Sequence, residues 1–466
     1  MRVLSSKQGR TRQHACLDSV PLRAVERVSA MKAVFGAMIV LMAACFTPVG
    51  AQDSLSGNTP IETIENLNRA IRLDPTNPIS YNKRGMAHLF AGRPEQAAAD
   101  FATVIEMLPN NAVAYQNRAR AYLEAGDFGR SIADFDESLK LDPTWAESYQ
   151  GRGVAHTKSG ALDKGIADFN EAIRRKPTAS SYTSRGTAYA MKKQFDRAIV
   201  DFDEALRLEP QRAESIQSRG SAWIYKGEID RGIADFDKAI ELDGRQASWY
   251  NLRGSAYVAK GDFVRAAEDF RRAVERDPDN AEYQRNLGVS HAEQDDNRPA
   301  LAYLDKALAL NPGDDVALSS RGFVRYRLGD FDGAFVDLDK AVALNPNHAD
   351  HYNNRGEIYR RDGKLEKALA DFDRALQLDP RQRSAQQNRA IVFLDRKQYD
   401  QAIADFDTVI ALKLDNEETY YGRAVALRET GRADKAVADL EHVLGRNPNF
   451  YKARDLLREI KSETPQ

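Results

Sequence analysis

The repeating unit of this chain is clearest at residues 349–382, which read ADHYNNRGEIYRRDGKLEKALADFDRALQLDPRQ. Tyr352, Gly356 and Tyr359 recur at i, i+4 and i+7, so they share one face of a first helix. Gly363 follows where that helix must stop. The segment therefore begins with a short amphipathic helix that ends in a glycine turn.

A second helix follows the turn, because apolar residues again recur at helical spacing. Its apolar stripe consists of Leu365, Ala368, Phe372, Ala375 and Leu376. Pro380 cannot continue this helix and disfavours α geometry in the residue before it. A single hairpin of two such helices has an uncovered apolar face, so it needs a neighbouring hairpin.

Neighbouring hairpins are present, because the terminal proline recurs through the chain. The steps are 34 residues or a multiple of 34, with one step of 33, between Pro75, Pro109, Pro143, Pro177, Pro210, Pro278, Pro312, Pro346, Pro380 and Pro448. Gly244 and Leu414 occupy the two missing places. A fixed period of this length indicates an array of repeats and not a domain with one central core.

Small residues recur at the points where the two helices of each hairpin must cross closely. On the first helix they are Gly85, Ala119, Gly153, Gly186, Gly220, Gly254, Gly288, Gly322, Gly356, Ala390 and Ala424. On the second helix they are Ala97, Ser131, Gly165, Ala198, Gly232, Ala266, Ala300, Ala334, Ala368, Ala402 and Ala436. With this ladder and this period, the chain resembles the tetratricopeptide repeat family.

The resemblance implies an all-α fold, a right-handed α-solenoid of about eleven 34-residue helix-turn-helix repeats. We expect the full repeats to span residues 78–450. Residues 52–77 should contain a lone second helix, a half-repeat that caps the array. Residues 451–466 should contain a last capping helix with a polar outer face, as a solenoid needs for solubility, and a tail.

One position departs from the usual family pattern, since arginine stands directly before the small residue of the first helix. These arginines are Arg84, Arg118, Arg152, Arg185, Arg219, Arg253, Arg321, Arg355, Arg389 and Arg423. The second helices carry a matching row of Asp100, Asp134, Asp168, Asp201, Asp235, Asp269, Asp337, Asp371, Asp405 and Asp439. Only the repeat 281–314 lacks the arginine, with Leu287, and it also lacks the aspartate, with Tyr303. The joint loss favours an ion pair within each repeat over one between repeats.

Residues 1–51 read as an N-terminal extension with a secretory signal, and Met31 is a possible true start. A short apolar run after Lys32 leads to a small-residue cleavage site, which leaves Gln52 as the mature N-terminus. The alternative is lipoprotein processing at Cys45, which would attach the chain to a membrane. The expected location is therefore periplasmic or secreted, with a membrane-anchored lipoprotein as the alternative.

Composition and motifs argue against several classes of function. A net charge of −2 shows no basic character of the kind that nucleic-acid binders have, so no nucleic-acid partner is expected. No phosphate-binding loop, nucleophile elbow or dinucleotide fingerprint occurs, so we expect no enzyme and no cofactor. His348 and His351 are the only histidines with metal-ligand spacing, and no third ligand stands near them, so no metal site is expected. His88, His156 and His291 fill a helix position that is tyrosine in other repeats, and they read as packing residues.

The resemblance implies that a protein or peptide partner binds in a concave groove lined by the first helices. The groove positions give Asn117, Arg120, Tyr225, Asn251, Phe323, Tyr326, Arg327, Asn353, Asn354, Glu357, Arg360, Arg361 and Asn388. Amides suit recognition of an extended peptide backbone, and aromatic and arginine side chains dominate interface energetics. The expected function is a non-catalytic protein–protein interaction scaffold of the bacterial envelope.

Two other functions remain open from the sequence. Tyr225, Trp249, Phe323 and Tyr326 could stack on sugars, which would make the chain a carbohydrate or cell-wall binder, or an assembly factor for an envelope polysaccharide. The chain could also be a subunit of an enzyme whose catalytic residues lie in another chain.

Overall fold

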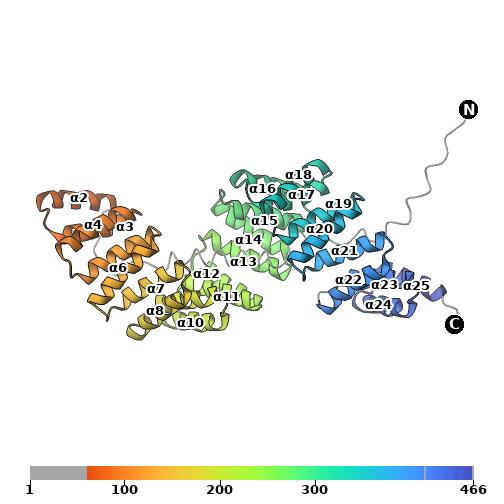
Figure 1. Cartoon of the computed structure of the whole chain (residues 1–466), viewed down its shortest axis with the longest axis horizontal. Helices are drawn as coiled ribbons and strands as arrows, with labels where there is room; N and C mark the ends of the chain where they lie inside the picture. Colours follow the sequence, from red (N-terminus) through yellow and green to blue (C-terminus); the bar gives the residue numbers. More distant parts are fainter. Residues whose placement is uncertain (1–59, 414–415, 464–466) are drawn as a thin grey trace, which may run out of the picture. The chain divides into compact units, whose positions relative to one another are not determined.

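The computed structural model describes residues 60–413 and 416–463, in which it contains 24 helices and no strand (Figure 1). The all-α fold of repeated helix-turn-helix units is therefore confirmed. The expected signal segment, the Cys45 alternative and the possible start at Met31 lie outside the described residues. None of the described helices is both long enough and apolar enough to cross a membrane.

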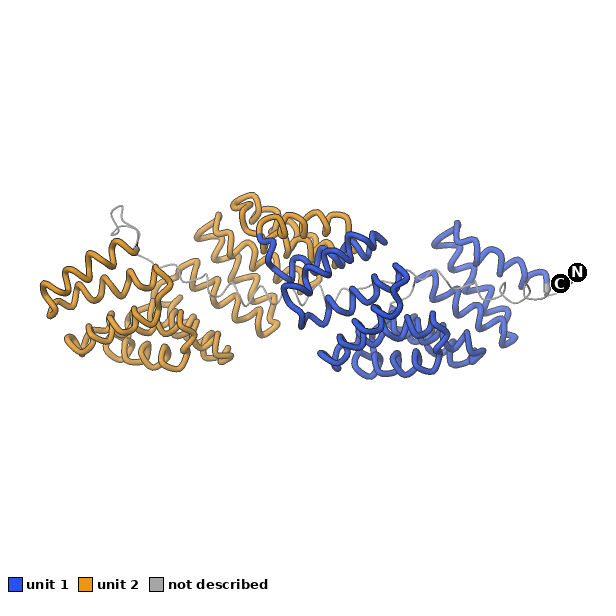
Figure 2. Tube along the Cα trace, turned by 90° about the horizontal axis from the view of Figure 1, so that it is seen from above, with its two compact units in different colours: residues 1–26, 277–466 blue, residues 27–276 orange. Residues whose placement is uncertain are grey.

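The chain forms two compact units, which Figure 2 colours separately. Unit 2 covers residues 27–276 and unit 1 covers residues 1–26 and 277–466. The described helices of unit 2 are α2 (Pro60–Leu73), α3 (Pro78–Phe90), α4 (Pro94–Met107), α5 (Ala112–Glu124), α6 (Phe128–Leu141), α7 (Ala146–Lys158), α8 (Leu162–Arg175), α9 (Ala179–Met191), α10 (Phe195–Leu208), α11 (Ala213–Lys226), α12 (Ile229–Leu242), α13 (Ala247–Lys260) and α14 (Phe263–Arg276).

Unit 1 continues the same alternation of first and second helices. Its described helices are α15 (Ala281–Glu293), α16 (Asn297–Leu310), α17 (Asp315–Arg327), α18 (Phe331–Leu344), α19 (Ala349–Arg361), α20 (Leu365–Leu378), α21 (Arg383–Asp395), α22 (Tyr399–Ala411), α23 (Glu417–Glu429), α24 (Ala433–Arg446) and α25 (Tyr451–Glu463). Within each unit, every helix packs on the helix before it and the helix after it, and successive first helices also touch.

The turn between the two helices of a repeat needs a residue in the left-handed region. Gly363 supplies it after α19, with φ of 73°. Where the sequence has no glycine at this place, Lys193, Asp295 and Lys397 adopt φ of 59°, 61° and 58°. A left-handed residue is thus required by the geometry of the turn, and glycine meets the requirement with the least strain.

The core is a row of aromatic and leucine side chains, each lying under the small residue of the first helix. Phe372 is fully buried and faces Gly356. A Cβ atom built on Gly356 would lie 2.8 Å from Cε1 of Phe372, closer than a normal contact allows. Close packing of this kind explains why the crossing position holds only glycine or alanine in the eleven repeats.

Candidate functional site

The arginine and aspartate rows form one bidentate ion pair within each repeat. In the repeat 349–382, Arg355 Nε donates to Asp371 Oδ2 and Arg355 Nη2 donates to Asp371 Oδ1, both at 2.8 Å. The same pairing joins all ten predicted partners, at 2.5–3.0 Å, and confirms the prediction. The hydrogen bond to Asp371, opposed by burial, raises the pKa of Arg355 above its usual range.

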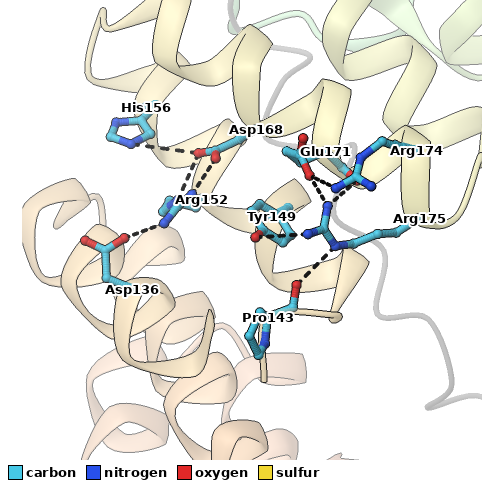
Figure 3. A network of polar contacts seen from close by, with 9 residues as sticks. All are labelled: Asp136, Pro143, Tyr149, Arg152, His156, Asp168, Glu171, Arg174 and Arg175. Atoms are coloured by element: carbon cyan, nitrogen blue, oxygen red, sulfur yellow. Dashed lines mark hydrogen bonds and ion pairs between the residues drawn. The ribbon is translucent and has the colours of Figure 1, made fainter. Parts of the chain in front are cut away.

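The sequence analysis missed a second acceptor for the same guanidinium. Arg355 Nη1 donates to Asp339 Oδ1 of the preceding repeat at 2.8 Å, and Arg152 Nη1 donates to Asp136 Oδ1 at 2.6 Å (Figure 3). The acceptor lies sixteen residues before the arginine, and the paired aspartate lies sixteen residues after it. A signal was present, because many second helices carry Asp-Phe-Asp or Asp-Leu-Asp, whose second aspartate serves the next repeat. Each arginine of this kind therefore joins two repeats as well as two helices.

A different arginine makes a further contact at two places in unit 2. Arg175 Nε donates to the carbonyl of Pro143 at 3.1 Å, and its Nη2 donates to Tyr149 Oη at 3.2 Å (Figure 3). Arg276 repeats the arrangement, with the carbonyl of Gly244 at 2.9 Å and Tyr250 Oη at 3.2 Å. These arginines, like the ladder, are occupied in holding repeats together.

The three histidines expected to pack do lie among core side chains. The side chains of His88 and His156 are 12% and 14% exposed, and His156 Nε2 lies 3.8 Å from Asp168 Oδ2 (Figure 3). Burial lowers the pKa of both histidines, against the opposing effect of the neighbouring aspartate. His291 stacks on Tyr303, with ring centroids 5.5 Å apart.

The candidate groove residues divide into two groups by burial. Seven are buried, namely Asn117, Asn251, Phe323, Asn353, Asn354, Glu357 and Asn388. Arg120, Tyr225, Tyr326, Arg327 and Arg360 are half-buried and Arg361 is exposed. Their role in binding stays a prediction, but the buried side chains are held in place by neighbouring residues and only partly offered to solvent.

The buried amides link successive first helices. Asn388 Nδ2 of α21 donates to Asn353 Oδ1 of α19 at 3.1 Å. Asn354 Nδ2 donates to Ser319 Oγ of α17 at 3.0 Å. Asn117 and Asn82 pair in the same way in unit 2, at 3.0 Å. These amides therefore hold the first helices at a fixed spacing.

The C-terminal ends of α17 and α19 carry a cluster of aromatic and charged side chains, which we call the Arg–aromatic cluster: Phe323, Tyr326, Arg327, Glu357, Arg360 and Arg361. The buried Glu357 carboxylate accepts from Arg360 Nε at 2.8 Å and from Arg361 Nε at 2.7 Å. The Arg327 guanidinium lies over the Phe323 ring, 4.6 Å from its centroid, and its Nη1 lies 2.6 Å from Asp295 Oδ1. The arrangement fixes three guanidinium groups beside a half-buried tyrosine.

Burial dominates the electrostatics of this region. It lowers the pKa of Arg327, and it raises the pKa of Tyr326, which faces Arg361 and Glu357. Burial also lowers the pKa of Arg120 in unit 2. A guanidinium removed from water in this way binds a carboxylate or a carbonyl oxygen more strongly than one in bulk solvent.

The rings that suggested sugar binding are mostly covered. Trp249 and Phe323 are 5% and 2% exposed. Tyr225 stacks on Phe195, with centroids 5.3 Å apart. Tyr326 contacts Phe331, which is 54% exposed. An open platform for a sugar ring therefore has at most the edge near Tyr326 in its favour.

His348 and His351 stack on one another, with ring centroids 4.3 Å apart. His351 Nε2 lies 2.8 Å from Asp315 Oδ2, and this contact holds the pKa of Asp315 well below its usual range. Among the described residues, no group of three or more His, Cys, Asp or Glu side chains is placed to hold a metal ion. The pair reads as a packing and hydrogen-bonding contact between α19 and α17.

Comparison with known proteins agrees with the repeat architecture. A family model described as tetratricopeptide repeat matches in overlapping segments at residues 82–146, 117–180, 151–213, 218–281, 251–315 and 388–449. Two related models match residues 349–382 and 322–363. Together these matches cover more than half of the chain, and they indicate no catalytic family.

Several solved structures share the fold at low identity. The Cut9–Hcn1 hetero-tetramer of the APC/C is 16% identical, with 86% of this chain and 100% of that chain covered and a TM-score of 0.45. Yeast Tom70 is 16% identical, with 94% and 96% covered and a TM-score of 0.45. The TPR domain of P58(IPK) is 18% identical, with 85% and 98% covered and a TM-score of 0.35. No curated protein gave a significant match. On its repeat matches, the chain belongs to the tetratricopeptide repeat family.

Proposed function

We propose that the chain is a non-catalytic scaffold of the bacterial envelope that binds a polypeptide segment along the surface of its first helices. The observation that carries this proposal is the Arg–aromatic cluster at the ends of α17 and α19. Exposed Arg361 and half-buried Tyr326 lie there beside a buried Glu357, which holds two guanidinium groups in place. Arginine and tyrosine held rigidly at a partly desolvated surface are typical of interface hot spots.

The ladder supports this proposal by showing which charges are already used. The ten arginines before the small residue each have an aspartate of their own, and most have a second acceptor in the preceding repeat. They are therefore poorly suited to bind an anionic ligand. The polar groups that remain for recognition stand at the groove positions of the first helices.

Site-specific photo-crosslinking tests the proposal. The photoreactive residue p-benzoylphenylalanine replaces Tyr326 in one variant and Val336 in a control variant. Val336 lies on α18 of the same repeat and is 65% exposed. We expect a discrete cross-linked polypeptide from envelope extract at position 326 and none at position 336.

A charge reversal and a glycan screen complete the test. Arg361→Glu in the position-326 variant should reduce the cross-link at least fivefold, because it removes a cation next to the probe. Arg174→Glu, at an exposed arginine of α8 that also pairs with a glutamate, should leave the yield unchanged. Binding to glycans together with no cross-link to any polypeptide would overturn the scaffold proposal.

The envelope location has its own measurement. Mass spectrometry of the protein purified from its bacterial host should find a mature N-terminus at Gln52. A diacylglyceryl modification on Cys45 would show the lipoprotein route instead. An unprocessed N-terminus in the cytosolic fraction would contradict export.

A further inference from the structure

The second helix at the N-terminal edge, α2, is not covered as the other second helices are. In every second helix from α4 to α24, the three positions that face the first helix of the same repeat are buried. In α20 these are Ala368, Phe372 and Ala375, each 0% exposed. The equivalent residues of α2 are Thr63, Leu67 and Ala70, and all three are only half-buried. The place of a first helix therefore lies open along α2.

The neighbouring helix α3 is open on the matching side. In the first helices α5, α7, α9, α11, α13, α17, α19, α21 and α23, the third and sixth helical positions are buried against the preceding first helix. Asn354 is an example, since it donates to Ser319 of α17. In α3 the same positions are Ser80, which is half-buried, and Lys83, which is exposed. Two adjacent helices thus lack the same neighbour.

A second copy of the chain does not fit this place. The only lone first helix among the described residues is α25, at the other edge of the array. Its residue at the crossing position is Arg458, whose side chain is 73% exposed, and Leu457 stands where ten repeats have the ladder arginine. A Cβ alone at the crossing position of α19 would lie 2.8 Å from the partner ring, so an arginine there prevents the close crossing. The C-terminal edge is closed by polar side chains.

We propose that α2 and α3 form a docking edge for one helix of another protein, which takes the place that a first helix takes in each full repeat. The eleven repeats of this chain show the chemistry required. The helix needs glycine or alanine where it crosses Leu67. It also needs a carboxylate at the position that faces Lys83, because the first helices of this chain place an amide or hydroxyl acceptor there, such as Asn353 or Ser319.

This edge lies in unit 2 and shares no residue with the Arg–aromatic cluster of unit 1. Either proposal can therefore fail while the other stands.

A synthetic helix tests the edge directly. The probe is a fluorescent, side-chain-stapled peptide with the sequence of residues 349–361 carrying Asn353→Asp, since an unstapled helix of this length is marginal in water. Fluorescence anisotropy with the full chain should show saturable binding. Hydrogen exchange should show that the bound probe protects α2 and α3 and leaves α24 unchanged.

A charge swap makes the result specific. Lys83→Glu should weaken binding of this probe at least tenfold, and a probe with Asn353→Lys should restore it. Leu67→Asp should also weaken binding at least tenfold. Lys164→Glu, at an exposed lysine of α8, is the matched control and should change nothing. Circular dichroism melts establish that the variants fold, and the charge swap decides the case if Leu67→Asp does not.

Three results would overturn the proposal. The first is the absence of probe binding to the full chain. The second is equal affinity in the Lys83→Glu and Lys164→Glu variants. The third is concentration-dependent self-association that Lys83→Glu abolishes, because it would assign the edge to a second copy.

Discussion

At the scale of single residues, the ladder arginine is the most constrained side chain of the repeat. Arg355 donates to two aspartates from different repeats and lies 5.7 Å and 5.9 Å from the ring centroids of Tyr352 and Tyr359. Its side chain is 18% exposed and that of Asp371 is 8% exposed. A charge pair buried to this degree is costly to break from one side, because the remaining partner keeps a charge without a counter-ion.

We therefore predict strong coupling between Arg355 and Asp371. Arg355→Ala or Asp371→Ala alone should lower the free energy of unfolding by roughly 2–3 kcal/mol, between the costs for an exposed and a fully buried pair. The double variant should lose about 1–2 kcal/mol less than the sum of the single losses. Asp339→Ala, which removes an acceptor whose side chain is 59% exposed, should cost less than about 1 kcal/mol. Additive losses in urea denaturation would show that the pair does not act as a unit.

The buried histidines predict a pH dependence of stability. Burial lowers the pKa of His88 and His156 in the folded chain, so the unfolded chain takes up these protons more readily. Their contribution to stability is complete above a pH of about 6.5, the value for an unperturbed histidine, and is lost as the pH falls through the lowered pKa. His88→Tyr with His156→Tyr should reduce the loss of stability between pH 7 and pH 5, because tyrosine fills this position in other repeats. An unchanged difference between melts at the two pH values would contradict this.

At the scale of the helix pair, close crossing decides which residues the hairpin tolerates. The glycine positions differ in this respect. Gly356 faces the Phe372 ring, whereas Gly445 lies in α24 with no atom within 4 Å of the place of a Cβ. The same change should therefore have opposite signs at the two positions.

Gly356→Ala should lower the free energy of unfolding by about 1–2 kcal/mol, because the added methyl group must displace the ring. Gly445→Ala should raise it by roughly 0.5–1 kcal/mol, since alanine favours the helix and meets no neighbour. Thermal denaturation of the two variants beside the parent chain measures both effects. Stabilisation by Gly356→Ala would show that the crossing is looser than the contact distance indicates.

The helix pairs also show how far the sequence was sufficient. The period, the glycine turn and the Arg–Asp pairing sixteen residues apart all followed from residue type and spacing. The burial of Asn353, Asn354 and Asn388 did not, because it depends on how closely successive first helices approach. The second acceptor, such as Asp339, was present as a pattern but was overlooked, because its partner lies in the next repeat. Contacts within a repeat were therefore predictable, and contacts between repeats were only partly so.

At the scale of the whole molecule, each helix depends on its immediate neighbours, so stability should be distributed locally along the array. Arg152 links α6 to α8 through α7 by its contacts with Asp136 and Asp168. Arg152→Ala should raise hydrogen exchange in α6, α7 and α8 at least fivefold. Exchange in α19 and α20 should not change, and mass spectrometry of peptides from both regions would show it. Equal deprotection in the two regions would indicate one cooperative unit.

The ladder has a consequence for how the length of such a chain can change during evolution. Asp339 and Arg389 are 50 residues apart, and deletion of the 34 residues from 349 to 382 would bring them to a separation of 16. That is the separation of every arginine and the acceptor before it in this unit, so the shortened chain would already contain an intact contact at the new junction. In-register recombination can thus add or remove a repeat without any compensating substitution. Chains descended from a common ancestor should accordingly differ in repeat number by whole multiples of 34 residues more readily than by shorter insertions.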